Sequence, residues 1–275
     1  MAEHDTGTDQ LLCFLRDRVA TVTLNRPDAR NALSNELTTA LRRAIAWAAS
    51  EPDVGALVIT GAGSAFCSGG DVKAMGRPTN QSGAEASPSA EQLFQEMRAR
   101  HHEIAGALHR LRKPSIAALP GAAAGAGMAI ALACDLRVAA KSAFLSTAYA
   151  RIGLPGDYGI AWLLTRIVGP ARARELMLTA ERVDAEKAER IGLVNRVVAD
   201  DALEAEAFAL ARQLAHGPQV AFAYIKDNLD EALSIDHATA IDREADRLLK
   251  ARTTEDHREA VRAFAEKRDP NFNNR

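Results

Sequence analysis

The strongest constraint on the fold is an alternation of short apolar runs with amphipathic helical segments, which extends from the first residues to about Pro170. Val54–Thr60 and Ser115–Leu119 are apolar along most of their length, a pattern typical of strands covered on both faces. Ser34 precedes a segment whose apolar positions share one stripe, and serine is a favoured helix cap. Strand, helix and buried strand in this order form a right-handed crossover unit. The sequence therefore predicts an α/β fold.

The same alternation predicts the other elements of this part of the chain. A hairpin is expected at Leu11–Leu15 and Val19–Leu24, and a mobile loop at Gly76–Ala90, which is rich in Gly, Pro, Ser, Asn and Gln. One helix is expected to place Leu93, Met97, His101, Ile104, Leu108 and Leu111 on a single face. Further elements are predicted at Met128–Cys134 and Ile160–Ile167 (helices) and at Leu136–Ala139 and Phe144–Tyr149 (strands).

After Pro170 only helices are predicted, at Ala171–Thr179, Ala185–Ile191, Ala202–His216, Gln219–Ser234 and Ala238–Lys267. We therefore divide the chain into a core over residues 11–200 and a C-terminal helical region over residues 201–275. A helical extension of this kind is expected to dock on a neighbouring subunit.

Composition excludes several classes of function. The 275 residues contain 34 Lys and Arg against 36 Asp and Glu, and only 8 Phe, 3 Tyr and 2 Trp, so nucleic acid is not an expected partner. Three cysteines without CxxC spacing fit a reducing compartment. The sequence shows neither a signal peptide nor an apolar span of about 20 residues, so a cytoplasmic protein without a membrane segment is expected. The seven histidines show no metal-binding spacing, so no metal is expected.

The first candidate site is the glycine-rich loop Gly61–Asp71, which follows a predicted strand. Gly61 and Gly63 have the spacing found in dinucleotide-binding loops. The third glycine position is occupied by Phe66, however, and no acidic residue ends a second strand about 20 residues later. Nucleotide binding is therefore not predicted, and a tight turn that requires positive φ is the simpler interpretation of this loop alone.

A second loop of the same construction, Pro120–Met128, also leads from a strand through small residues into a helix. Two such strand ends can direct two backbone amides toward one point, which is how an oxyanion hole is built. A thioester carbonyl bound there would become more acidic at its α carbon, because the enolate oxygen would meet fixed donors. Close helix packing explains one such loop but not two. Cys67 and Cys134 adjoin these loops and are interpreted as small packing residues.

Asp157 is the candidate acid–base group, since it is the only acid between Lys141 and Arg174 and lies in a glycine-rich turn before an apolar helix. Burial at such a place would raise the pKa of the carboxyl toward the range of a general base. The alternative is that Asp157 caps the helix beginning near Tyr158.

Four ordered motifs resemble the signatures of the crotonase (enoyl-CoA hydratase/isomerase) family, from about residue 11 to the end of the chain. They are Asn25-Arg26-Pro27 with Asn31-Ala32-Leu33, then Ala65-Phe66-Cys67-Ser68-Gly69-Gly70-Asp71-Val72-Lys73, then Gly121 to Gly127 with Ala133-Cys134-Asp135, and Ala263-Phe264-Ala265-Glu266-Lys267-Arg268. The resemblance implies a crotonase-like ββα spiral core followed by a C-terminal helical trimerisation region. It also implies a homotrimer or a dimer of trimers.

The resemblance further implies the roles of individual residues. The oxyanion hole would consist of the Gly70 and Ala126 amides. Coenzyme A would be bound by Arg30, Ala32, Ser68, Gly70, Val72, Lys73, Phe264 and Lys267, the last two often across a subunit boundary. The acyl group would lie near His102, Met128, Ala129, Tyr149 and Trp162. No cofactor is implied other than the coenzyme A of the acyl-CoA substrate.

Two departures from the family pattern narrow the expected chemistry. Hydratases of the family add water with two glutamates, but those positions correspond here to Ala129 and Tyr149. With Asp157 as the remaining acid, the simplest reaction is isomerisation of a 3-enoyl-CoA to a 2-enoyl-CoA, because one carboxyl can remove the C2 proton and return it at C4.

Three alternatives stay open at this point. Hydration would have to depend on Asp157 alone. Hydrolysis like that of the aryl-CoA dehalogenases is suggested by the position of His102, which in that group activates water while an aspartate attacks the ring. A protein that binds acyl-CoA without turnover would use Asp157 only structurally, and the effect of Asp157→Asn separates it from an enzyme.

Overall fold

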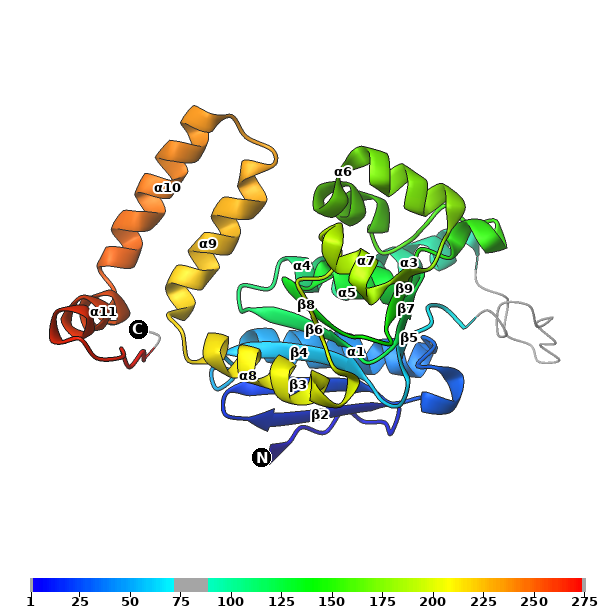
Figure 1. The fold of residues 1–275 in the computed structure, drawn as a ribbon, viewed down its shortest axis with the longest axis horizontal. Coiled ribbons are helices and arrows are strands. Elements are labelled where there is room, and N and C mark those ends of the chain that lie inside the picture. Colours follow the sequence, from blue (N-terminus) through cyan, green and yellow to red (C-terminus); the bar gives the residue numbers. More distant parts are fainter. Residues whose placement is uncertain (1, 72–88, 274–275) are drawn as a thin grey trace.

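The computed structural model describes residues 2–71 and 89–273, which form two β-sheets surrounded by helices (Figure 1). Within these residues the larger sheet has the strand order β1-β2-β3-β4-β6-β8-β11 and the smaller sheet the order β10-β9-β7-β5. The strands of the larger sheet are β1 (Ala2–Glu3), β2 (Leu11–Arg16), β3 (Val19–Leu24), β4 (Ala56–Gly61), β6 (Ser115–Leu119), β8 (Leu136–Ala140) and β11 (Arg196–Val198). Those of the smaller sheet are β5 (Ala65–Cys67), β7 (Ala122–Ala124), β9 (Phe144–Ser146) and β10 (Val183–Asp184).

The helices account for most of the remaining chain. They are α1 (Asn35–Ser50), α3 (Ala90–Glu103), α4 (Ala105–His109), α5 (Ala126–Ala133), α6 (Ile160–Thr179), α7 (Ala185–Arg190), α8 (Leu203–Ala215), α9 (Gln219–Ala232), α10 (His237–Arg252) and α11 (Glu255–Glu266). Short 3-10 helices lie at η1 (Pro27–Ala29), η2 (Tyr149–Ile152) and η3 (Asp200–Ala202). The predicted mobile loop Gly76–Ala90 lies almost entirely outside the described residues.

The larger sheet is parallel from β3 to β11, which confirms the predicted α/β class. The predicted hairpin joins β2 to β3 through Asp17 and Arg18, both of which have positive φ. Such a turn follows the right-handed twist of the paired strands. β6 is buried throughout and β4 is buried except at Thr60, as expected from the apolar runs that predicted them.

Helix α1 connects β3 to β4 and begins at the predicted cap. The Ser34 hydroxyl oxygen accepts a hydrogen bond of 3.0 Å from the Leu37 amide, and Glu36 lies in the first turn, where the helix dipole favours an acid. The apolar stripe that includes Leu41 and Ile45 is buried, and the helix lies against β2 and β3. Capping and apolar periodicity together therefore determine this helix.

The sequence does not predict the smaller sheet as a separate layer, because its strands are only two or three residues long. β5, β7 and β9 are parallel, and β10 is antiparallel to β9. The chain enters this sheet after β4 and again after β6. The second entry requires Gly121, because a Cβ at this residue would lie 2.0 Å from the carbonyl oxygen of Ser64. Each glycine-rich loop thus follows a strand of the larger sheet and contains a strand of the smaller sheet, β5 in the first loop and β7 in the second.

Several predicted helix boundaries are wrong. The helix expected from Leu93 to Leu111 is divided into α3 and α4 at Ile104, whose backbone is not helical, and Leu93 and Met97 are about half exposed. The prediction of helices alone after Pro170 misses β10 and β11. The predicted helix Ala238–Lys267 is divided into α10 and α11. By contrast, the prediction of two helices on either side of Pro170 is confirmed, because α6 is interrupted at Gly169, whose backbone is not helical (φ 78°, ψ 164°).

The C-terminal helices differ in how they contact the sheets. α8 packs against β3, β4, β6 and β8, whereas α9, α10 and α11 extend away from the sheets (Figure 1). The middle of α9 is held to the core by an ion pair of 2.7 Å between Lys226 and Asp135. α8, which follows residue 201, packs against the larger sheet. The division of the chain at residue 201 stays a prediction.

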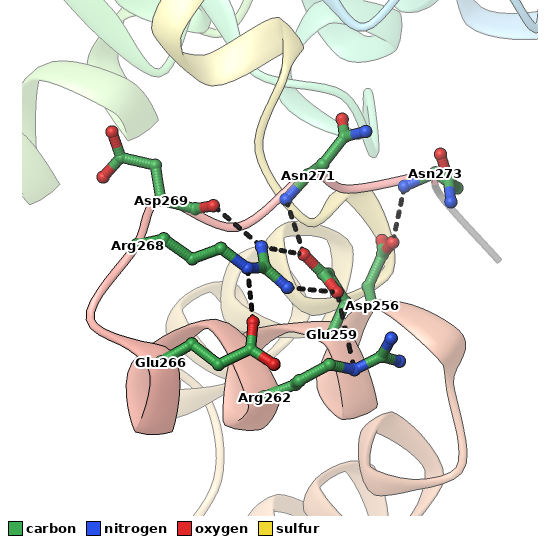
Figure 2. A network of polar contacts seen from close by, with 8 residues as sticks. All are labelled: Asp256, Glu259, Arg262, Glu266, Arg268, Asp269, Asn271 and Asn273. Atoms are coloured by element: carbon green, nitrogen blue, oxygen red, sulfur yellow. Dashed lines mark hydrogen bonds and ion pairs between the residues drawn. The ribbon is translucent and has the colours of Figure 1, made fainter.

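The chain folds back on itself after α11 through the polar network in Figure 2. The Arg268 guanidinium donates to Glu259 at 2.6 Å and to Glu266 at 2.7 Å, and the Asn271 amide donates to Glu259 at 3.1 Å. The backbone N–H of Asn273 donates to the Asp256 carboxylate at 2.7 Å. These contacts hold the segment that follows Lys267 against α11. Among the described residues, the helices include none with the length and apolar character that crossing a bilayer requires.

Candidate active site

The two glycine-rich loops meet at one edge of the smaller sheet. β5 and β7 are parallel neighbours, so the residues after Cys67 and after Ala124 leave the sheet side by side. A Cβ at Gly69 would lie 2.9 Å from the Ala124 carbonyl oxygen and 3.5 Å from the Ala126 nitrogen. A Cβ at Gly125 would lie 3.9 Å from the Gly69 Cα. The close approach of the loops therefore depends on glycine at residue 69.

These loops carry the two predicted oxyanion-hole amides. Ala126 is the first residue of α5, where an amide has no acceptor within the helix and lies at the positive end of the helix dipole. Gly70 lies opposite Leu33 in an isolated parallel bridge, in which the Leu33 amide donates to the Gly69 carbonyl. Neither the Gly70 nor the Ala126 amide donates to another group in the part of the chain that the structure describes. Both amides are therefore available to an acceptor such as a thioester oxygen.

Asp157 lies in a turn formed by residues with positive φ, namely Gly156, Tyr158 and Gly159. The alternative prediction that Asp157 caps the next helix is wrong. The cap of α6 is Gly159, which has no side-chain hydrogen bond, and the Asp157 carboxylate instead accepts a hydrogen bond from the Tyr149 hydroxyl. The turn thus directs the carboxylate back toward η2 rather than toward the amides of α6.

Tyr149 connects this carboxylate with the loops. A Cβ at Gly125 would lie 3.9 Å from Cζ of Tyr149, and the Tyr149 hydroxyl is bonded to Asp157. The Asp157 carboxylate, the phenol and the loop before Ala126 therefore belong to one site. The sequence singles out Tyr149 as a residue near the acyl group that stands in place of a glutamate, but it does not show this hydrogen bond to Asp157.

The surroundings alter the protonation of the site. Burial raises the pKa of the Asp157 carboxyl above 3.8, while the hydrogen bond from Tyr149 and the charges of His101 and Arg100 act in the opposite direction. Burial lowers the pKa of His101, and the Asp157 charge opposes this effect. A carboxyl whose pKa is raised by burial is a stronger proton acceptor than an exposed aspartate once it is ionised.

A groove of about 450 Å³ lies beside Asp157 between α3, α4 and α6, and its lining includes His101, His102, His109, Tyr158 and Trp162. The ring centroids of His101 and Tyr158 lie 4.2 Å apart, and those of His109 and Trp162 lie 4.9 Å apart. His102, the histidine singled out in the sequence, is exposed, and it is His101 whose charge interacts with Asp157. The sequence predicts His101 on the apolar face of this helix but does not connect it with Asp157.

The predicted coenzyme A residues of the first two motifs lie together. The Ser68 amide donates to the Arg30 carbonyl at 3.0 Å, and Ala32 is buried next to the bridge between Leu33 and Gly70. Val72 and Lys73 lie outside the described residues.

Asn31, which the sequence did not single out, holds these segments together. Its side chain is fully buried, donates to the carbonyls of Ala62 and Ala65 at 3.0 and 2.8 Å, and accepts from the Arg26 amide at 2.8 Å. The only signal for it is its place within the second half of the first motif.

The other predicted residues are distributed between the interior and the far end of the molecule. Met128 and Ala129 are buried in the first turn of α5. Phe264 is 87% exposed, and α11 lies far from α3 and β5, so Phe264 and Lys267 do not meet the site within one chain (Figure 1).

The cysteines next to the glycine-rich loops are not activated thiols. Cys67 and Cys134 are buried, and burial raises the pKa of each thiol to about 12. No group of His, Cys, Asp and Glu among the residues placed by the structure could hold a metal ion.

Comparison with known proteins identifies the family. The model of the family described as enoyl-CoA hydratase/isomerase matches residues 15–275. The chain is 34% identical to the 1,2-epoxyphenylacetyl-CoA isomerase of Escherichia coli, over 95% of this chain and 97% of that protein, and 33% identical to the crotonyl-CoA hydratase of Syntrophomonas wolfei, over 96% and 98%. A crystal structure of an enoyl-CoA hydratase from Polaromonas sp. JS666 superposes with a TM-score of 0.86 at 33% identity, over 94% of this chain and 98% of that chain. The two glycine loops and their neighbouring acid thus occur in a chain that belongs to the enoyl-CoA hydratase/isomerase family.

Proposed function

We propose that this enzyme isomerises a 3-enoyl-CoA to the conjugated 2-enoyl-CoA, with Asp157 as the single acid–base group. The observation that supports this choice is the partly buried Asp157 carboxylate, which accepts a hydrogen bond from Tyr149 beside the loop of Ala126. Ala129 and Tyr149 take the places of the two glutamates expected of a hydratase. One relative, from E. coli, is also named an isomerase, of 1,2-epoxyphenylacetyl-CoA.

The proposed reaction moves one proton between two carbons. Asp157 removes the C2 proton, and the electron pair of the C–H bond passes into the thioester as an enolate. The Gly70 and Ala126 amides donate hydrogen bonds to the enolate oxygen, where the charge develops. The protonated Asp157 then returns the proton to C4, while the double bond shifts to C2–C3. The reaction is balanced with no cofactor besides the coenzyme A of the substrate.

Substrate binding is proposed to involve two copies of the chain. Arg30, Ala32, Ser68, Val72 and Lys73 would line the coenzyme A site of one chain. Phe264 and Lys267 would reach that site only from a second copy, because α11 lies far from the loops within its own chain. We therefore propose a homotrimer or a dimer of trimers, with His102, Met128, Ala129, Tyr149 and Trp162 on the acyl side of the site.

The test is the exchange of the C2 hydrogens of phenylacetyl-CoA in D₂O, followed by NMR, together with the isomerisation of a 3-enoyl-CoA. The exchange assay detects the enolate step even when the natural acyl group is unknown. Asp157→Asn is expected to lower both rates by about 10²–10⁴-fold while the Kd for the thioester stays within about threefold. Exchange in the variant at the parent rate would show that Asp157 is not the base. Absence of both exchange and isomerisation in the parent would favour binding without turnover.

Hydration is the second candidate function, because the S. wolfei relative is named a crotonyl-CoA hydratase. Incubation of the enzyme with crotonyl-CoA in water separates the two activities. An isomerase is expected to leave the absorbance of the conjugated thioester unchanged, and a rapid loss of this absorbance would establish hydration instead.

A further inference from the structure

Tyr149 is fixed by hydrogen bonds of both its backbone and its side chain. It begins η2 and is 5% exposed. Its amide donates to the Thr147 carbonyl at 2.8 Å, and its carbonyl accepts from the Leu154 amide at 3.0 Å. Both backbone groups are therefore fixed, and the hydroxyl is held against Asp157.

The direction of the hydrogen bond between the two side chains is determined by the chemistry of the phenol. Burial, and then the neighbouring Asp157 charge and hydrogen bond, raise the pKa of Tyr149 far above its usual value. The phenol therefore stays protonated throughout the working pH range and donates to the carboxylate. A donor to a carboxylate stabilises its ionised form, which opposes the effect of burial on Asp157.

The same bond makes the two carboxylate oxygens of Asp157 unequal. Oδ1 accepts from Tyr149, whereas Oδ2 has no hydrogen-bond partner among residues 2–71 and 89–273. With Oδ1 held, rotation of the carboxylate is restricted. One oxygen is thus anchored and the other is available for a proton.

We propose that Tyr149 is a positioning residue of this enzyme: its hydroxyl anchors Oδ1 of Asp157, keeps the carboxylate ionised near neutral pH and leaves Oδ2 to accept and return the substrate proton. The inference rests on the proposed function, in which Asp157 is the base. It assigns a role to the phenol that stands where a hydratase of the family would have a glutamate.

The pH dependence of kcat/KM for C2 exchange of phenylacetyl-CoA tests this role. In Tyr149→Phe the midpoint of the acid limb is expected to rise by about one pH unit, because the ionised carboxyl loses a charge-assisted donor. Exchange at a pH below both midpoints would then fall by about tenfold and recover toward the parent value at high pH. The Kd for the thioester should change by less than about twofold.

Two further substitutions make the test specific. Tyr158→Phe removes the hydroxyl of an adjacent buried tyrosine that is not bonded to Asp157, so it should leave the midpoint unchanged. Replacement of Tyr149 by 3-fluorotyrosine keeps the hydroxyl and makes it a stronger donor, so the midpoint should fall below that of the parent. This second variant preserves the packing if Tyr149→Phe proves unstable.

The outcomes separate the inference from the proposed function. Equal midpoints in the parent, Tyr149→Phe and the fluorotyrosine variant, with exchange abolished by Asp157→Asn, would overturn the role of Tyr149 and leave Asp157 as the base. Midpoints that move in the same direction in both Tyr149 variants would overturn it as well. Persistent exchange in Asp157→Asn would overturn the proposed function itself.

Discussion

At the scale of single residues, the site places a carboxylate where folding disfavours its charge. Asp157 is largely removed from water and has one side-chain donor, Tyr149. Burial of an ionised group costs free energy unless hydrogen bonds replace its hydration. The same burial makes the ionised carboxyl a stronger base, so reactivity and stability oppose each other at this residue.

Because the ionised carboxylate destabilises the fold, Asp157→Asn is expected to increase stability by an amount that depends on pH. The pKa of Asp157 is raised from 3.8 on folding, so its contribution to stability is fully present below pH 3.8 and is lost as the pH rises through the folded-state pKa. The neutral amide of the Asp157→Asn variant does not ionise, so the stability of the variant does not fall in this way as the pH rises. The difference in Tm between the variant and the parent, measured by calorimetry, should therefore be larger at pH 8 than at pH 4. A difference that is constant or shrinks over this range would contradict the raised pKa.

Local sequence patterns show the two glycine-rich loops and Asp157, and the family resemblance selects Gly70 and Ala126 within those loops. Neither shows which hydrogen bonds the site residues make. The roles of Asn31 and Tyr149 depend on hydrogen bonds to residues 34 and 8 positions away. Such pairings follow from the tertiary fold, which local patterns do not contain.

At the scale of elements, strands and helices with strong periodicity are predicted well and short ones are not. β6 occupies the predicted residues, and α1 begins at its predicted cap. β10 and β11 have two and three residues, too few to show an alternation, and are stabilised by pairing with β9 and β8. The helix predicted from Leu93 to Leu111 is divided into α3 and α4, and Leu93 is exposed, so the apolar stripe alone does not define the length of a helix.

The contact between α5 and β5 yields a prediction for Gly127. A Cβ at this residue would lie 2.3 Å from the Cys67 carbonyl oxygen, so Gly127→Ala must push the start of α5 away from the first loop. We expect a loss of about 1–3 kcal/mol in the free energy of unfolding and of about 100-fold in the C2 exchange rate, because the two amides separate.

Urea denaturation and the exchange assay measure the two effects. Gly106→Ala is the matched control for stability, because its Cβ would approach the guanidinium end of the long Arg110 side chain, at 3.1 Å, rather than backbone, and its unfolding free energy should not fall. Parent-like exchange in Gly127→Ala would show that the amide spacing does not limit the reaction.

At the scale of the whole molecule, the C-terminal helices leave apolar surface uncovered. Ala223 is the only residue buried in α9, and no residue of α10 is buried, although both helices are described in full. The exposed apolar side chains of this region are Ile225, Leu229, Leu233, Ile241, Leu248, Leu249, Val261 and Phe264. Apolar faces on consecutive helices are typical of surfaces that pair with another subunit.

The proposed oligomer predicts that Leu229→Glu weakens association. The side chain is 65% exposed on α9, so the substitution should preserve the fold of the core while it places a charge in the subunit contact. Light scattering should show a shift toward the mass of a single chain and a weaker affinity for the thioester, since Phe264 would no longer reach a neighbouring site. Leu178→Glu, at a 78% exposed leucine of α6, is the control and should leave the mass unchanged. A parent protein that is monomeric at micromolar concentration would refute the prediction.

The two amides at Gly70 and Ala126 belong to the main chain, and this has a consequence for how the enzyme could change. Exchange of neighbouring side chains does not delete a backbone donor. Ala129, Tyr149 and Asp157 could therefore be varied together in a combinatorial library while the activated thioester is retained. The scaffold thus separates electrophilic activation from the choice of reaction, which is the property that directed evolution of new acyl-CoA chemistry requires.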